Sequence, residues 1–365
     1  MPQDSSGPNL YGITKQNSSR SGSELWGKNQ FNSTFPLSLC LYMRDQQLSP
    51  ISIRMRDGKI FADDNAWTMQ EIIGENHQSP YYEFEHSFKP YANLSRKNKI
   101  DNIDLVISIN GVPSIPLEVK LTVVPDSGTS RKPENKWAPE MVMRPVSSAH
   151  AMMGVASSLR HPKNSRIKFK VIKALKPAYN KVSSWDSEAE IIKYADLIHN
   201  ALQNTLIISE SIQKPFLLQP IWRTKGQSLE LCEKCFDVFA WSDIAIMGIP
   251  VQEYTTAGRM TRTFREIARH VRSLYDVLRA GDYDYSGIYK GMSHGNQTDK
   301  SFAIGGNVSI KYLKHERLLC PILPRTALKK IILKGGESQL KPERRFDAAV
   351  QAHMIQQKMI QQKTP

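Results

Sequence analysis

The stretch Ile103-Asp-Leu-Val-Ile-Ser-Ile-Asn-Gly111 decides how this chain folds. Its first seven residues alternate apolar and other side chains with the two-residue period of a half-buried β-strand. Asn110-Gly111 follows at once and favours a tight hairpin turn, because both residues tolerate positive φ. The segment from Ile115 to Val123 then alternates again. The sequence therefore predicts an antiparallel hairpin, with Pro113 and Pro116 placing the start of its second strand at a sheet edge or in a bulge.

The polar face of this hairpin carries two acids and a lysine. If the apolar faces of both strands pack into the core, Asp104, Glu118 and Lys120 share the opposite face. Two carboxylates supply the hard oxygen ligands that Mg²⁺ prefers, and this ion takes a further ligand from a phosphate. An ammonium group beside it can position a water molecule or stabilise developing charge. The pattern predicts a metal site for phosphodiester chemistry, and the competing interpretation is a salt-bridged pair on a strand surface.

The charge of the chain favours a polyanionic partner. Its 365 residues include 49 Lys and Arg against 35 Asp and Glu, a net charge of +14. Such an excess is typical of proteins that bind nucleic acid, and an anionic membrane surface is the second choice. Apolar runs such as residues 244–251 are too short to span a bilayer, and the first residues show no secretory signal. We therefore expect a cytoplasmic protein that is not embedded in a membrane.

The chain divides into three expected segments. Residues 1–23 are rich in Ser, Gly and Asn and are expected to be loosely ordered, and residues 334–365 form a basic, Gln-rich tail. Between them, residues 24–333 are expected to form one domain. Helices are expected at 145–159, 187–209 and 259–278, and strands at 167–172 and within 215–222 and 236–254. The sum is a mixed α/β or α+β protein with a central sheet.

The four cysteines suggest reduced thiols. Cys232 and Cys235 form a CxxC pair, but a zinc ribbon needs a second pair or a spaced pair of histidines, which the sequence does not offer. We therefore interpret these two cysteines as ordinary residues of a helix or turn.

The helix expected at 259–278 carries a second stripe beside its apolar one. Its four arginines advance by three, four and three residues: Arg262, Arg265, Arg269 and Arg272. Guanidinium groups at this spacing can grip a phosphate backbone or reach guanine edges. The alternative is a solvated face that pairs with Glu266 and Asp276.

The hairpin residues resemble the PD-(D/E)xK nuclease superfamily, whose signature is an acid on one strand and acid-x-Lys on the next. Here thirteen residues separate Asp104 from Glu118-Val-Lys120, and Ile103 stands where the superfamily often has Pro. The resemblance implies a restriction-endonuclease-like core with a central mixed sheet flanked by helices and with N- and C-terminal elaborations. It also implies a further metal-binding acid from a preceding helix. The candidates are Glu71, Glu75, Glu83 and Glu85, of which Glu85 is preferred.

A second resemblance concerns the N-terminal block. Trp26-Gly-Lys-Asn-Gln-Phe-Asn-Ser-Thr-Phe-Pro36, with the Leu-Ser-Leu-Cys-Leu-Tyr-Met that follows, is similar to type II restriction endonucleases of the HindVP and HgiDI kind. This resemblance implies Mg²⁺-dependent cleavage of double-stranded DNA at a degenerate palindrome of the GRCGYC type by a homodimer, with a cognate DNA methyltransferase as genetic partner. Two alternatives stay open: a non-catalytic nucleic-acid-binding protein, and a repair or recombination nuclease that selects DNA structure.

Overall fold

The computed structural model describes residues 40, 44, 47, 49–63, 66–74, 80–98, 100–119, 145–220, 222–225, 228–231, 238–254, 256 and 258–292. The two expected terminal segments and the Cys232/Cys235 pair lie outside these residues, so the expected division into three segments stays a prediction. The strands are β1 (Ile51–Arg56), β2 (Lys59–Asp63), β3 (Pro80–His86), β4 (Ile103–Ile109), β5 (Val112–Val119), β6 (Pro215–Pro220), β7 (Trp222–Lys225), β8 (Ser228–Leu231) and β9 (Val238–Ser242). The α-helices are α2 (Met69–Ile72), α3 (Lys89–Ala92), α4 (Pro145–Arg160), α5 (Ser165–Lys181), α6 (Glu188–Lys193), α7 (Ala195–Ser209), α8 (Asp243–Glu253), α9 (Arg262–Ala280) and α10 (Tyr285–Gly291).

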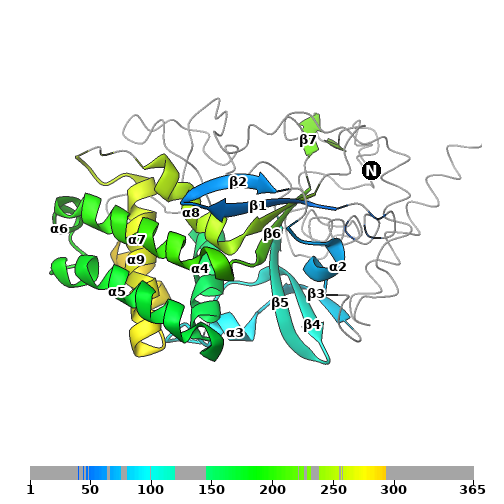
Figure 1. The fold of residues 1–365 in the computed structure, drawn as a ribbon, viewed down its shortest axis with the longest axis horizontal. Coiled ribbons are helices and arrows are strands. Elements are labelled where there is room, and N and C mark those ends of the chain that lie inside the picture. Colours follow the sequence, from blue (N-terminus) through cyan, green and yellow to red (C-terminus); the bar gives the residue numbers. More distant parts are fainter. Residues whose placement is uncertain are drawn as a thin grey trace, which may run out of the picture.

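A mixed sheet of seven described strands forms the centre of the fold, in the order β2-β1-β9-β6-β5-β4-β3. The pairs β1–β9 and β5–β6 are parallel and the other pairs are antiparallel. Figure 1 shows α5, α6, α7 and α9 gathered on one side of the molecule, β3, β4 and β5 on the other, and α4 between them. This mixed sheet with flanking helices confirms the expected fold class.

The predicted hairpin is confirmed. Strands β4 and β5 pair antiparallel, and Asn110 and Gly111 occupy the turn with φ of 51° and 77°. The register shifts between Ile107 and Ser108, opposite the stretch that contains Pro113. Only Glu118 and Val119 of β5 pair with β6, so within the described residues the proline-containing part of β5 has a strand neighbour on one side alone. Both prolines therefore lie in a part of β5 that forms a sheet edge among the described strands, where proline is tolerated.

The helix predictions at 145–159 and 259–278 are confirmed by α4 and α9, and the apolar stripe of α9 is buried from Phe264 to Leu278. Three other expectations are wrong. Residues 167–172 belong to helix α5 rather than to a strand. The strand expected within 236–254 is present as β9 but stops at Ser242, so its expected extent is wrong, because residues 243–253 form helix α8. The long helix expected at 187–209 is broken at Tyr194 into α6 and α7. Within the described ranges, no helix has both the length and the apolar character needed to cross a membrane.

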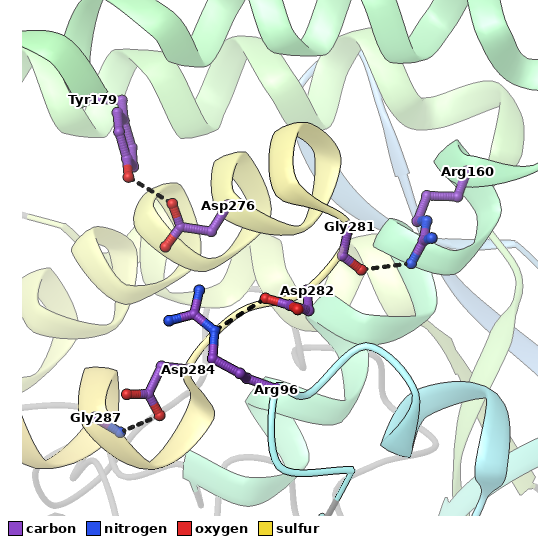
Figure 2. A network of polar contacts seen from close by, with 8 residues as sticks. All are labelled: Arg96, Arg160, Tyr179, Asp276, Gly281, Asp282, Asp284 and Gly287. Carbon is purple, nitrogen blue, oxygen red and sulfur yellow. Dashed lines mark hydrogen bonds and ion pairs between the residues drawn. The ribbon is translucent and has the colours of Figure 1, made fainter.

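The C-terminal end of α9 is tied to two other helices (Figure 2). Gly281 ends the helix with φ of 91°, a left-handed conformation that glycine adopts at no steric cost. The carbonyl oxygen of Gly281 accepts a hydrogen bond of 2.8 Å from Arg160 at the end of α4. Tyr179 of α5 donates a hydrogen bond of 2.6 Å to Asp276 of α9. These bonds fix α4, α5 and α9 relative to one another.

Candidate active site

The two predicted acids face each other across neighbouring strands. The register pairs Leu105 of β4 with Leu117 of β5. One residue further from the turn on each strand, the same register places Asp104 opposite Glu118. Directly opposed residues of an antiparallel pair project from the same face of the sheet. The pattern of the sequence predicted this juxtaposition, and the backbone register agrees with it.

The Asp104 carboxylate accepts a backbone hydrogen bond at the end of the β4–β5 ladder. Its Oδ2 atom accepts a hydrogen bond of 2.8 Å from the backbone N–H of Val119, and its side chain is partly exposed. A carboxylate that accepts a backbone N–H is held in one orientation, since the strand that carries the donor is itself fixed. Asp104 is therefore both positioned and reachable from solvent.

Glu118 is buried, with 6% of its surface exposed, and two polar residues of helix α4 lie beside its carboxylate. The hydroxyl of Ser147 donates a hydrogen bond of 3.0 Å to Oε1 of Glu118. The Nδ1 atom of His150 lies 4.0 Å from Oε2, and the His150 side chain is almost completely buried. Burying a carboxylate is costly unless polar partners compensate, and the hydrogen bond from Ser147 in the first turn of α4 offsets part of that cost.

Sequence reasoning missed Ser147 and His150. Both lie on a helix whose residues from Ser147 to Ala156 are all buried. Polar side chains on a helix that is buried all round require buried partners, and this is the signal that could have identified them.

The other predicted acids come from different places. Glu85 belongs to strand β3, not to a helix as expected, and the register that pairs Phe84 with Leu105 and His86 with Ile103 places Glu85 across from Asp104. Glu71 instead completes a capping box at the start of α2, where its carboxylate accepts the backbone N–H of Thr68 at 2.7 Å. Lys120 and Glu75 lie outside the described residues. Three neighbouring strands thus carry Glu85, Asp104 and Glu118 at opposed positions of the backbone.

A pair of carboxylates on neighbouring strands is a donor set of the kind that Mg²⁺ binds. The part of the chain that the structure describes holds no cluster of three or more His, Cys, Asp or Glu side chains that could enclose a metal ion. Mg²⁺ retains several waters and binds through one or two carboxylates plus phosphate oxygens, so the opposed carboxylates of Asp104 and Glu118 fit it.

The arginine stripe of α9 does not lie on the protein surface. Arg265 and Arg269 have no exposed area, and Arg272 is partly exposed and pairs with Asp186 at 2.9 Å. The side chain of Arg262, the first residue of α9, lies outside what the structure describes. The prediction of an exposed arginine grip is therefore wrong for Arg265 and Arg269, because the face of α9 that carries them lies inside the molecule.

Arg269 instead belongs to a buried polar cluster that α4 and α10 share with α9. Its guanidinium lies 3.6 Å from the carboxylate of Glu266, donates to the carbonyl of Tyr289 at 2.9 Å and covers the Tyr289 ring. His270 lies 3.2 Å from Glu266 and 3.0 Å from the hydroxyl of Ser148. Burial alone would raise the pKa of Glu266, but the hydrogen bond and charge of His270 and the charge of Arg269 hold this pKa below its ordinary value. The adjacent residues Ser147 and Ser148 thus link the candidate site and this cluster through one helix.

A mixed sheet flanked by helices, with acids opposed on its neighbouring strands, defines a protein of the restriction-endonuclease-like nuclease class. The model of the HindVP restriction endonuclease family matches residues 26–355, and the chain belongs to this family. It is 32% identical over 349 residues to the type II restriction enzyme HgiDI of Herpetosiphon aurantiacus, covering 94% of this chain and 95% of the relative. It is 29% identical over 350 residues to the probable type II restriction enzyme HindVP of Haemophilus influenzae, covering 94% and 93%. No solved structure matches the chain. The enzyme class is therefore that of a site-specific deoxyribonuclease.

Proposed function

We propose that this restriction endonuclease hydrolyses phosphodiester bonds of double-stranded DNA at the face of β4 and β5 that carries Asp104 and Glu118. The observation that supports this proposal is the opposition of the two acids across adjacent strands, with one hydrogen bond of 2.8 Å on Asp104 and one of 3.0 Å on Glu118. Carboxylates held in this way do not reorganise when charge develops on the phosphate, which is a general requirement for electrostatic catalysis.

Each residue has a defined part in the proposal. Asp104 and Glu118 hold Mg²⁺, and Glu85 is the additional acid of the site. Bound Mg²⁺ supplies Lewis-acid stabilisation of phosphate charge and lowers the pKa of a coordinated water. Lys120, two residues beyond Glu118, orients the water that attacks the phosphorus in line with the leaving 3′ oxygen. Ser147 and His150 are positioning residues that act through the Glu118 carboxylate.

The recognition sequence and assembly are part of the same proposal. A short palindrome, of the GRCGYC type that the family resemblance implies, presents two identical half-sites. A homodimer with two-fold symmetry matches such a site, because each subunit then places one active site at one DNA strand. An enzyme of this kind in the cytoplasm has access to the host genome. A cognate DNA methyltransferase would protect that DNA from cleavage.

The proposal is tested by plasmid cleavage with Mg²⁺, using the wild type, Asp104→Asn, Glu118→Gln and Lys120→Ala. The matched control is Asp101→Asn, an exposed acid three residues before Asp104. We expect discrete fragments from the wild type and the control, and a loss of about 100-fold or more in cleavage rate for each site variant and in EDTA. DNA binding measured in Ca²⁺ should survive in the site variants, since they remove catalytic groups and not the fold.

Three results would contradict the proposal. Discrete fragments that persist in Glu118→Gln would move the active site elsewhere. Cleavage that depends on DNA branches or ends would indicate a structure-selective nuclease. Salt-dependent binding with no cleavage under any divalent metal would indicate a binding protein.

A further inference from the structure

The segment from Pro145 to Trp185 contains no acidic residue and eight basic ones. The eight are Arg160, Lys163, Arg166, Lys168, Lys170, Lys173, Lys176 and Lys181. Arg160 is used inside the protein, where it donates to the carbonyl of Gly281, and Lys181 lies over the ring of Tyr194. The others fall on α5 or on the short turn before it, so the excess of positive charge is concentrated on one helix.

The rotation of α5 about its own axis is fixed by the residues that it buries. Val171, Leu175 and Ala178 have no exposed area and pack toward α7 and α9. The ring of Tyr179 stacks on Tyr275 of α9 with centroids 4.1 Å apart, and its hydroxyl donates to Asp276 (Figure 2). These contacts leave one face of α5 directed away from the protein.

That outward face carries Arg166, Lys170 and Lys173. Their spacing of four and three residues aligns them along about 10 Å of the helix, on the side opposite Leu175. All three are exposed, and Phe169 beside them is 69% exposed. Among the residues that the structure describes, no carboxylate lies within ion-pair distance of these three side chains. The described residues therefore leave the positive charge of this face unbalanced.

We propose that this outward face of α5, defined by Arg166, Lys170 and Lys173, binds the phosphate backbone of double-stranded DNA without regard to sequence. The occupant follows from charge complementarity: a row of unbalanced cations fits a polyanion, and the duplex is the polyanion on which this enzyme class acts. Cations of this kind set the register and orientation of a protein on DNA, whereas base contacts made elsewhere give specificity.

The position of α5 in the fold agrees with this role, on the assumption that the active site is at Asp104 and Glu118 as proposed. The first turn of helix α4 lies beside Glu118, because its Ser147 hydrogen-bonds that carboxylate. The sixteen residues of α4 span roughly 22 Å and end at Arg160, just before α5. One turn of B-DNA is about 34 Å long. A duplex with its scissile phosphate at Glu118 therefore extends far enough to reach α5 within about one turn.

The experiment compares two triple variants that remove the same charge. The test variant is Arg166→Gln, Lys170→Gln, Lys173→Gln. The control is Lys59→Gln, Lys193→Gln, Lys214→Gln, three exposed lysines on other segments. Binding to a non-cognate duplex of about 30 base pairs is measured in Ca²⁺ between roughly 50 and 200 mM salt. Each phosphate contact contributes about 0.9 to the slope of log K against log salt, so the test variant should lose about 2 to 3 from this slope. The control should lose less than about 1.

Equal slopes for the two triple variants would overturn the proposal. A loss of affinity for anionic phospholipid vesicles with an unchanged DNA slope would also overturn it, since the face would then serve a membrane. Thermal unfolding of both variants shows whether the fold is intact, which the exposure of all six side chains leads us to expect. Glu118→Gln in the same assay separates this proposal from the active-site assignment, since this variant should keep the wild-type slope while losing cleavage. If Glu118→Gln still cuts DNA, the active-site assignment fails and the proposal for α5 does not.

Discussion

Replacing Ser147 with Ala tests whether α4 positions the Glu118 carboxylate of the proposed active site. The variant removes the hydroxyl that donates to Oε1 of Glu118 at 3.0 Å, and both residues are buried, with 2% and 6% of their surfaces exposed. A hydrogen bond to a charged group contributes about 1.5–3 kcal/mol. His150 remains 4.0 Å from the other carboxylate oxygen in this variant. We therefore expect kcat to fall about tenfold, which corresponds to about 1.4 kcal/mol, with KM for DNA unchanged.

The neighbouring residue provides a matched control. Ser148→Ala deletes the same atom from the same buried helix, but the Ser148 hydroxyl contacts His270 and not Glu118. Both variants should lose about 1–2 kcal/mol of unfolding free energy, since each leaves a buried polar group with one partner fewer. Only Ser147→Ala should lower kcat, and Ser147→Thr, which retains a hydroxyl, should restore it. Single-turnover cleavage and urea unfolding measure the two effects. The reasoning is refuted if both alanine variants lower kcat by the same factor, or if Ser147→Ala cuts at the wild-type rate.

Two further predictions concern stability. Burial raises the pKa of Asp243 to about 7, although the backbone N–H groups of Lys214 and Ile244 oppose the shift. The unfolded chain has the ordinary value of 3.8, so the wild type should lose stability relative to Asp243→Asn as the pH rises from about 4 to about 7, by up to about 4 kcal/mol. Urea unfolding at a series of pH values measures this, and a difference that is constant with pH would contradict it. Arg269→Ala should cost about 3–5 kcal/mol because it leaves Glu266 buried without its guanidinium partner. Arg272→Ala should cost less than about 1 kcal/mol because its pair with Asp186 is exposed, and equal costs in denaturant unfolding would show that the burial of Arg269 has been misjudged.

The elements that could be predicted well are those determined by residues close together in the sequence. The hairpin needs only alternation, an Asn-Gly turn and two prolines, and all of these lie within about twenty residues. Helix α5 was misjudged because Ile167, Phe169 and Val171 alternate with lysines as in a strand, yet Phe169 is exposed. A longer window shows Val171, Leu175, Ala178 and Val182 at helical spacing. Helix α8 escaped prediction for the opposite reason: residues 243–251 are buried all round, and a helix without a polar face has no period to detect.

The candidate site divides in the same way. Asp104 and Glu118 could be found because the hairpin alone brings them together. Ser147 and His150 could have been singled out as polar residues of a buried helix, but their placement beside Glu118 could not be predicted, because it depends on the packing of a helix that begins 26 residues after Val119. The burial of Arg265 and Arg269 was equally hidden, since an arginine row on a helix has the same pattern whether it faces solvent or a second helix. For Arg269 the position of α10, whose Tyr289 lies against the guanidinium, decides between these cases.

Helix α4 has a consequence for how this enzyme can change in evolution. Each residue inserted into or deleted from an α-helix turns everything beyond it by about 100° and shifts it by about 1.5 Å. An insertion between His150 and Arg160 would break the alignment between the carboxylate held at the start of α4 and the anchor on Gly281 at its end. The length of this helix is therefore fixed by two contacts at once, one at each of its ends.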